Sequence, residues 1–401
     1  MEGRIYRDMA RRTDGDIYIG VVGPVRSGKS SFIKRFMETT VIPRMEHDFR
    51  RDRAIDELPQ SAAGKTIMTT EPKFIPEEAV RLDMDDGARM NVRLIDCVGY
   101  IVPSSLGYIE NNQPRMVRTP WFEEAIPFNM AAELGTQKVI REHSTIGLVI
   151  TTDGSISDIP WEEYAEAEQR VISELQELEK PFAVLLNCRE PQSKTAQDLA
   201  KKLQEKYLVP VIAVNCLDLE EGEIREILSQ VLSEFPIKEI CIDLPRWIVV
   251  LSKDHWLKRA MFQCITDAAQ SIQRLSSVRE QLKALENCPQ IRHVHVDSVD
   301  MGSGSVKLTV TVEPKLFYEV LGESTGLTIN SEEELIPCMA ELAKIRREYE
   351  KIKGAIEEVQ ATGYGIVMPS LEELHLEEPE IVKQGGRFGV RLKASAPSIH
   401  M

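Results

Sequence analysis

Eight residues near the N-terminus combine glycines, a lysine and a serine at the spacing of a phosphate-binding loop. The segment Gly23–Ser30 reads GPVRSGKS and matches G-x-x-x-x-G-K-[ST] at every fixed position. Glycines let the backbone wrap closely round an anion, and the positive end of the following helix adds attraction. We expect Lys29 to reach the β- and γ-phosphates of a nucleotide and the Ser30 hydroxyl to ligate Mg²⁺. The other residues of this segment that we expect to line the nucleotide site are Gly23, Arg26, Ser27, Gly28 and Ser31.

A second G-K-T, at Gly64–Thr66, does not have the features of a phosphate loop. Pro59 stands where the first glycine is needed, and no apolar strand precedes the segment. The residues that follow lie between the first loop's helix and the next strand, where a nucleotide switch is expected. Thr69 or Thr70 is therefore predicted to ligate Mg²⁺ and to sense the γ-phosphate. The alternative for either residue is an ordinary β-strand threonine.

A third motif, Asp96-Cys97-Val98-Gly99, places D-x-x-G at the end of an apolar run. We expect Asp96 to hold Mg²⁺ through a water molecule and the Gly99 N–H to meet the γ-phosphate. D-x-x-G alone is a weak signal, but its position after the loop and the threonine segment strengthens it. The next residue is Tyr100 and not the glutamine that orients water in many GTPases. Hydrolysis is therefore expected to be slow or to be assisted from elsewhere.

The segment expected to read the nucleotide base departs from the guanine-specific pattern N-K-x-D. It reads Asn187-Cys188-Arg189-Glu190, so the asparagine remains while the lysine and the aspartate are replaced. A site that reads a base through such pairs loses discrimination when they are lost. We therefore expect ATP to be the nucleotide and Asn187 to contribute to its site. Two alternatives stay open: a GTP-dependent switch, and a scaffold that binds nucleotide without significant turnover.

Strands and helices alternate over the first part of the chain, as the three motifs require. This alternation predicts a mostly parallel sheet with helices on both faces, and residues 73–84 are expected to add an antiparallel strand. The segment between Gly99 and Phe128 has no clear periodicity and is long for a connection, which is typical of a functional or disordered loop. The apolar runs are 16–22, 92–96, 146–150, 182–186 and 209–214, and the helical patterns lie at about 29–39, 130–142, 161–179, 194–206 and 220–234.

The pattern changes near Pro236. Residues 255–286 place apolar side chains on one helical face, and residues 291–312 alternate as a hairpin does. Residues 333–361 predict a long helix whose apolar residues follow the three-four spacing of a coiled-coil seam. We expect that seam to pack inside its own domain, with a seam between subunits as the alternative.

Composition narrows the function classes. The 401 residues include 49 Lys and Arg against 64 Asp and Glu, a net charge of −15, which argues against nucleic acid as the main partner. No apolar run approaches the length of about eighteen residues of a membrane-spanning helix, and the N-terminus does not resemble a secretory signal. The seven cysteines are scattered without a C-x-x-C, so we expect reduced thiols in a cytoplasmic chain.

Several longer segments resemble the stage IV sporulation protein A family. These segments cover essentially the whole chain, and the middle and C-terminal ones are too particular for a generic phosphate-loop match. They are 23–30, 56–74, 96–100, 143–147, 151–154, 362–366 and 387–394.

The resemblance implies a translation-factor-like α/β P-loop NTPase domain at 1–238 that uses ATP with Mg²⁺. A smaller α+β middle region with long helices and a hairpin follows at 239–401. Carried onto this chain, the resemblance makes Lys29 the P-loop lysine, Ser30 the magnesium serine, Thr69 and Thr70 the sensor threonines, and Asp96 the magnesium-side aspartate. The family's further C-terminal domain is expected to be absent.

The resemblance also implies a biological role. Hydrolysis in the mother-cell cytoplasm is expected to drive polymerisation of the protein with itself into the basement layer of the spore coat. The polymer would lie peripherally on the forespore membrane surface. A small amphipathic membrane peptide and other coat morphogenetic proteins are the implied partners, and nucleic acid is not among them.

Overall fold

The computed structural model describes residues 4–45, 48–59, 72–84, 88–105, 108–110, 113–119, 122, 124–369 and 373–401. The chain divides into two compact units, 1–312 and 313–401, and each is considered by itself. The predictions for Thr69, Thr70 and the second G-K-T fall outside the described residues. None of the described helices is both long enough and apolar enough to cross a membrane.

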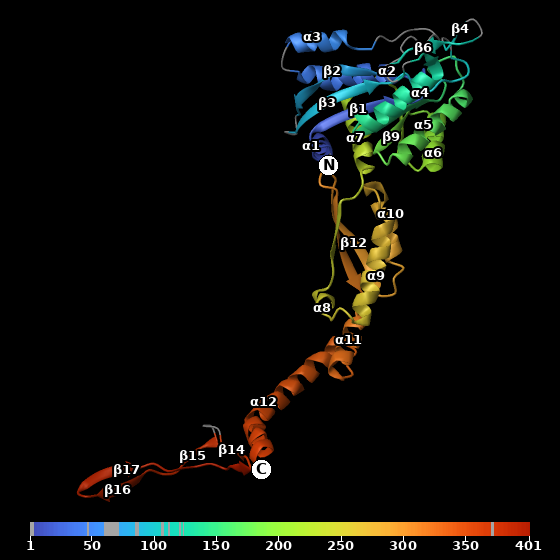
Figure 1. Cartoon of the computed structure of the whole chain (residues 1–401). Helices are drawn as coiled ribbons and strands as arrows, with labels where there is room; N and C mark the ends of the chain where they lie inside the picture. The colour runs from blue at the N-terminus through green and yellow to red at the C-terminus, as the bar shows by residue number, and fades with distance from the viewer. Residues whose placement is uncertain are drawn as a thin grey trace. The chain divides into compact units, whose positions relative to one another are not determined.

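A six-stranded sheet forms the centre of the first unit (Figure 1), in the order β10-β9-β8-β1-β3-β2. Five strands are parallel, and β2 alone runs antiparallel, beside β3. Both predictions, the mostly parallel sheet and the antiparallel strand, are confirmed. The strands are β1 (Asp16–Val22), β2 (Lys73–Asp83), β3 (Arg89–Asp96), β8 (Ile146–Thr152), β9 (Phe182–Asn187) and β10 (Val211–Val214).

Helices cover both faces of this sheet, as predicted. Buried apolar side chains of α1, α2, α3 and α7 form one hydrophobic cluster with the sheet, and those of α4, α5 and α6 form a second on the other face. The α-helices are α1 (Ile5–Arg12), α2 (Lys29–Phe36), α3 (Asp48–Asp56), α4 (Phe128–Lys138), α5 (Ala165–Glu177), α6 (Lys194–Tyr207) and α7 (Glu221–Ser233). The other helical turns are η2 (Met37–Val41), η3 (Ile42–Arg44), η4 (Val139–His143) and η5 (Trp161–Glu163).

The long connection between Gly99 and Phe128 contains secondary structure that its sequence did not reveal. Within its described part, four two-residue strands form two short antiparallel pairs, β4 with β5 and β6 with β7. Strands this short leave no periodicity to detect. They are β4 (Ile109–Glu110), β5 (Gln113–Pro114), β6 (Met116–Val117) and β7 (Ile126–Pro127).

A second, three-stranded sheet follows in the same unit, in the order β11-β13-β12. The predicted hairpin is present as β12 (Ile291–Asp300) and β13 (Ser305–Val312), and β11 (Glu239–Asp243) runs parallel to β13. The helices of this part are α8 (Arg246–Val249), α9 (Trp256–Ser271), η6 (Leu275–Ser277) and α10 (Val278–Leu285).

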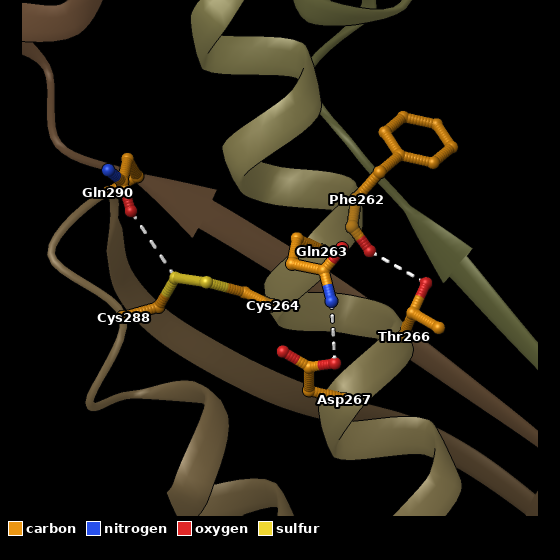
Figure 2. Close-up of a disulfide and its surroundings, with 7 residues drawn as sticks. All are labelled: Phe262, Gln263, Cys264, Thr266, Asp267, Cys288 and Gln290. Atoms are coloured by element: carbon orange, nitrogen blue, oxygen red, sulfur yellow. Dashed lines mark hydrogen bonds between the residues drawn. A yellow bond between two sulfur atoms is a disulfide. The ribbon is translucent and has the colours of Figure 1, made fainter.

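The expected apolar face at 255–286 is buried, for example at Leu257, Met261 and Leu282, but two helices share it and not one. The expectation of reduced thiols was wrong for Cys264 and Cys288, whereas the other five cysteines are free. The helical pattern is broken between α9 and α10, which pack against each other. Cys264 on α9 and Cys288 after α10 are joined by a disulfide, with their Cα atoms 6.6 Å apart (Figure 2). A continuous helix would separate residues 24 positions apart by about 36 Å. The turn that brings these two cysteines together is not apparent from their sequence spacing.

The second unit contains α11 (Lys315–Thr325), the long helix α12 (Glu332–Thr362) and a set of short strands (Figure 1). The expectation that α12 packs inside its own domain was wrong for most of its length, because Ala355 is its only buried residue. The strands, all paired antiparallel, are β14 (Ile366–Val367) with β19 (Ile399–His400), β15 (His375–Leu376) with β18 (Ala394–Ser395), and β16 (Glu380–Gln384) with β17 (Arg387–Arg391).

Candidate functional site

The glycine-rich loop connects β1 to α2 and has a backbone that only glycine tolerates at key points. Gly23 has a φ of 140° and Gly28 a φ of 100°, both in the range that side chains with a Cβ avoid. A Cβ on Gly28 would lie 2.0 Å from the side-chain nitrogen of Asn187, and one on Gly23 would lie 2.3 Å from the Ile150 carbonyl oxygen. Arg26 also has a positive φ, of 65°. The loop is therefore a tightly wound turn held against the ends of neighbouring strands.

Lys29, the first residue of α2, is buried under this loop. Its side chain is only 5% exposed, and Nζ donates hydrogen bonds to the carbonyl oxygens of Pro24, at 2.6 Å, and Gly23, at 3.4 Å. Burial lowers the pKa of Lys29 to about 8, and the charge of Asp96 opposes this shift. An ammonium group that has lost its water is a strong partner for an anion held in the loop.

Ser30 and Asp96 meet beside Lys29. The Ser30 hydroxyl donates to Oδ2 of Asp96 at 2.9 Å, whereas Oδ1 of Asp96 is buried without a hydrogen-bond partner. Burial raises the pKa of the Asp96 carboxyl, although the nearby ammonium of Lys29 opposes the rise. A carboxylate oxygen without a partner, next to a hydroxyl, is a donor set that fits a hard divalent cation such as Mg²⁺. The Ser27 hydroxyl is also buried and without a partner.

Gly99 and Tyr100 attach the end of the D-x-x-G segment to the loop. The Tyr100 N–H donates to the Gly23 carbonyl oxygen at 3.2 Å, and the Val25 N–H donates to the Tyr100 carbonyl oxygen at 2.8 Å. Gly99 has a φ of 92°, and a Cβ there would lie 2.3 Å from the Gly23 carbonyl oxygen and 2.6 Å from Nζ of Lys29, so only glycine fits. A change in this segment would therefore be transmitted directly to the loop.

The Tyr100 side chain belongs to the core. It is 2% exposed and packs in the hydrophobic cluster of α4, α5 and α6. Its hydroxyl donates a hydrogen bond to the carboxylate of Glu174 on α5. Burial raises its pKa. A side chain fixed in this way is not available to orient a water molecule as a GTPase glutamine does.

Asn187 holds the loop from the end of β9. Its side-chain NH₂ donates to the Ser27 carbonyl oxygen at 2.9 Å, and its side-chain oxygen accepts from the Cys216 N–H at 3.1 Å. We predicted that Asn187 contributes to the nucleotide site, and the structure places its side chain against the backbone of the loop. Cys188, in the place of a GTPase lysine, is fully buried, whereas Glu190 is exposed.

We predict that Asn187→Ala weakens both the fold and nucleotide binding. The change leaves a buried carbonyl and a buried N–H without partners, which costs about 1–3 kcal/mol for each unpaired group. Thermal unfolding should show a lower midpoint, and titration with a fluorescent ATP analogue should show about tenfold weaker binding. Gln204→Ala, which removes an exposed amide on α6, should change neither measurement. Full affinity in Asn187→Ala would contradict a positioning role.

The sequence-predicted residues that are described come together around one loop. They are Gly23, Arg26, Ser27, Gly28, Lys29, Ser30, Ser31, Asp96, Gly99 and Asn187. Sequence reasoning missed Lys73, which lies opposite Asp96 in the pairing of β2 with β3 and lowers the pKa of that carboxyl. It also missed Glu174 as the partner of Tyr100. The register of β2 against β3 would have shown that Lys73 lies opposite Asp96. No local sequence signal indicates that Glu174 is the partner of Tyr100.

Two family models together match the whole chain. The model described as Stage IV sporulation protein A, ATPase domain, matches residues 1–236, and the one described as the middle domain of the same family matches residues 237–401.

Three curated proteins are similar to this chain over nearly all of its length. Stage IV sporulation protein A of Clostridioides difficile (strain 630) is 46% identical over 401 residues, which are 100% of this chain and 82% of the relative. The proteins of the same name from Bacillus anthracis and Bacillus subtilis (strain 168) are 47% and 46% identical, each over 99% of this chain and 81% of the relative. A crystal structure of a variant of SsGBP is 16% identical, covers 57% of this chain and 62% of its own, and has a TM-score of 0.31.

Proposed function

Because this chain belongs to the stage IV sporulation protein A family, a sporulation family whose first domain is an ATPase domain, we propose that it hydrolyses ATP with Mg²⁺ on a P-loop NTPase fold. Hydrolysis then licenses assembly of the protein into a polymer. The observation that carries the enzymatic part is the buried Lys29 beside the Ser30–Asp96 pair, beneath a loop of main-chain amides.

The residues of the site have separate tasks in this proposal. The loop from Gly23 to Ser30 cradles the phosphates, and Lys29 turns from the loop carbonyls to the β- and γ-phosphates. Ser30 and Asp96 hold Mg²⁺, with Thr69 or Thr70 as a further ligand. When bound, Mg²⁺ neutralises charge on the transferred phosphoryl group. Gly99 lies against both Lys29 and the loop, so its segment can respond to the γ-phosphate.

ATP is favoured over GTP by the residues that replace the guanine-reading pattern. Cys188 is fully buried, so it cannot cover a base as an exposed lysine stem does. Glu190 is one methylene longer than the aspartate that pairs with guanine, which misplaces its carboxylate. The guanine-reading pattern also has an asparagine at the position of Asn187. In this chain the Asn187 side chain donates a hydrogen bond to the Ser27 carbonyl of the loop and accepts one from the Cys216 N–H. Its presence is therefore compatible with either base.

The proposed setting is the mother-cell cytoplasm. There the protein would assemble with itself on the forespore surface, bound peripherally to the membrane, as the basement layer of the spore coat. A small amphipathic membrane peptide and other coat morphogenetic proteins are its proposed partners. The family's sporulation role supports this setting.

Nucleotide competition on the purified chain tests the enzymatic proposal. Release of phosphate from ATP should require Mg²⁺ and should be unaffected by excess GTP. Suppression of ATP hydrolysis by GTP at equal concentration would instead support a GTP-dependent switch.

A nucleotide-binding scaffold without significant turnover is a second candidate. The core position of the Tyr100 side chain favours it, because Tyr100 stands where many GTPases have the water-orienting glutamine and its side chain is buried against Glu174. The two candidates differ in whether phosphate release depends on Lys29, a prediction developed in the Discussion.

A further inference from the structure

Helix α12 presents an apolar seam along most of its length. Eight residues from Leu335 to Val359 are spaced alternately by three and four positions, which keeps them on one side of the helix. In the middle of the seam, Leu342 is 38% exposed, Ile345 is 56% exposed and Tyr349 is 49% exposed. We define the α12 seam as Leu335, Cys338, Leu342, Ile345, Tyr349, Ile352, Ile356 and Val359.

Among the described residues of this helix, the seam is partly covered at the two ends, at Leu335 and Cys338 and from Ile352 onward. Ala355 is buried, and Gly365, just before β14, approaches it so closely that a Cβ on Gly365 would lie 2.1 Å from the Ala355 carbonyl oxygen. Towards the N-terminus, every residue from Met339 to Lys351 is exposed. The uncovered part of the seam therefore spans about two heptads.

Charged residues flank the seam in a pattern that selects a partner. With Leu342 and Tyr349 at heptad position a, Glu341 and Glu348 fall at position g, whereas Arg346 and Lys353 fall at position e. In a parallel pair of helices, each g residue meets the e residue five positions later on the other helix. Glu341 then meets Arg346 of a second copy, and Glu348 meets Lys353.

The antiparallel arrangement has the opposite electrostatics. There g residues meet g residues and e residues meet e residues, so glutamates would face glutamates and basic side chains would face basic side chains. Like charges in such positions are destabilising, and opposite charges set partner choice and orientation. Glu348 also pairs with Lys351 of its own helix at 3.2 Å, an exposed contact of small energy that does not change this preference.

We propose that α12 binds α12 of a second copy of this chain as a parallel two-stranded coiled coil. The interface is the exposed part of the α12 seam, and the flanking Glu–Arg and Glu–Lys pairs set its direction. The proposal names one surface for the self-assembly proposed above, and it needs no nucleotide. Dimerisation and ATP hydrolysis can therefore fail independently.

Sedimentation of the full chain without nucleotide tests the interface. The unmodified protein should show a concentration-dependent dimer, and Ile345→Asp should raise the dimer dissociation constant about tenfold or more. Ile336→Asp is the matched control, because Ile336 is 72% exposed on the same helix but lies off the seam. It should leave the dimer unchanged, and circular dichroism should show equal helix content in both variants. A monomer at all concentrations, or equal effects of the two variants, would overturn the proposal.

Charge exchange tests the pairing. The variant Glu341→Lys with Glu348→Lys should lose the dimer, because every flanking contact becomes repulsive. Adding Arg346→Glu and Lys353→Glu to the same chain should restore it. Failure of the fourfold variant to dimerise would exclude these pairs.

Cys338 tests the direction. It occupies position d, where a parallel pair places the two copies of the residue side by side. Mild oxidation should link the dimers covalently in a Cys241→Ser background, which removes an exposed thiol, and additional Cys338→Ser should abolish the link. A dimer that does not cross-link would overturn the parallel arrangement.

ATP hydrolysis by Ile345→Asp should match that of the unmodified chain. Loss of hydrolysis in this variant would implicate the nucleotide site and not the α12 seam.

Discussion

Replacing Lys29 with alanine is expected to reduce Mg²⁺-dependent phosphate release from ATP about a hundredfold or more. The ammonium group is the only described cation buried under the loop, and its present acceptors are two main-chain carbonyls. A triphosphate offers it a charged partner in a site shielded from water. A phosphate-release assay that compares the two proteins at saturating ATP measures the effect. Equal phosphate release from both proteins would favour the second candidate, a nucleotide-binding scaffold without significant turnover.

The buried state of Lys29 also predicts how nucleotide binding depends on pH. Its pKa in the free protein is about 8, against an ordinary value of 10.5, and a bound triphosphate favours the charged form. Binding must then be accompanied by proton uptake above pH 8, so affinity for ATP should fall as the pH rises past that value. Calorimetry in buffers of different ionisation enthalpy should detect the uptake in the unmodified chain and not in Lys29→Ala.

The lowered pKa of Lys29 also determines the direction in which the stability of the fold changes with pH. Between pH 8 and 10.5 the unfolded chain binds more protons at Lys29 than the folded chain does, so this residue makes the free energy of unfolding rise with pH in that window. Lys29→Ala should remove this contribution. It should not lower the unfolding midpoint at neutral pH, because burying the charge opposes folding there.

Replacing Asp96 with alanine is expected to separate turnover from stability. Mg²⁺-dependent hydrolysis should fall about a hundredfold, because Ser30 alone then remains of the oxygen pair beside Lys29. The unfolding midpoint at neutral pH should change little, because two effects oppose each other. Burial of the carboxylate, whose Oδ1 has no partner, opposes folding, whereas its charge stabilises the buried ammonium of Lys29.

Asp83→Ala is the matched control for that experiment. Asp83 lies at the other end of the β2–β3 pairing and is exposed beside Arg89, so its removal should leave turnover unchanged. Titration of activity with Mg²⁺ should show a higher Mg²⁺ concentration at half-maximal activity only in Asp96→Ala. A variant with a lowered midpoint and normal turnover would exclude Asp96 from the metal site.

The phosphate-binding loop, the D-x-x-G segment and the sheet were predictable from the sequence because the signals are local. Gly23, Gly28 and Lys29 follow a strand at fixed spacing, and both glycines have the positive φ that their residue type allows. The buried strands β8 and β9 appear as continuous apolar runs because both of their faces are covered. Family resemblance added the assignment to sporulation, which no local pattern contains.

Other features depend on contacts between distant residues. The partner of Tyr100 is Glu174, the partners of Asn187 are Ser27 and Cys216, and Cys264 reaches Cys288 only because the chain turns between α9 and α10. Spacing within one segment carries no information about which side chain another segment will present.

Helix α12 has both kinds of feature, those predictable from the local sequence and those that depend on distant contacts. Its heptad spacing and flanking charges were readable from the chain, because a helix places residues three and four positions apart on one face. Whether that face is covered is a property of the folded unit, and the neighbouring strands reach only as far as Ala355. Local rules establish which residues share a surface, whereas the packing of distant segments establishes which surfaces remain for a partner.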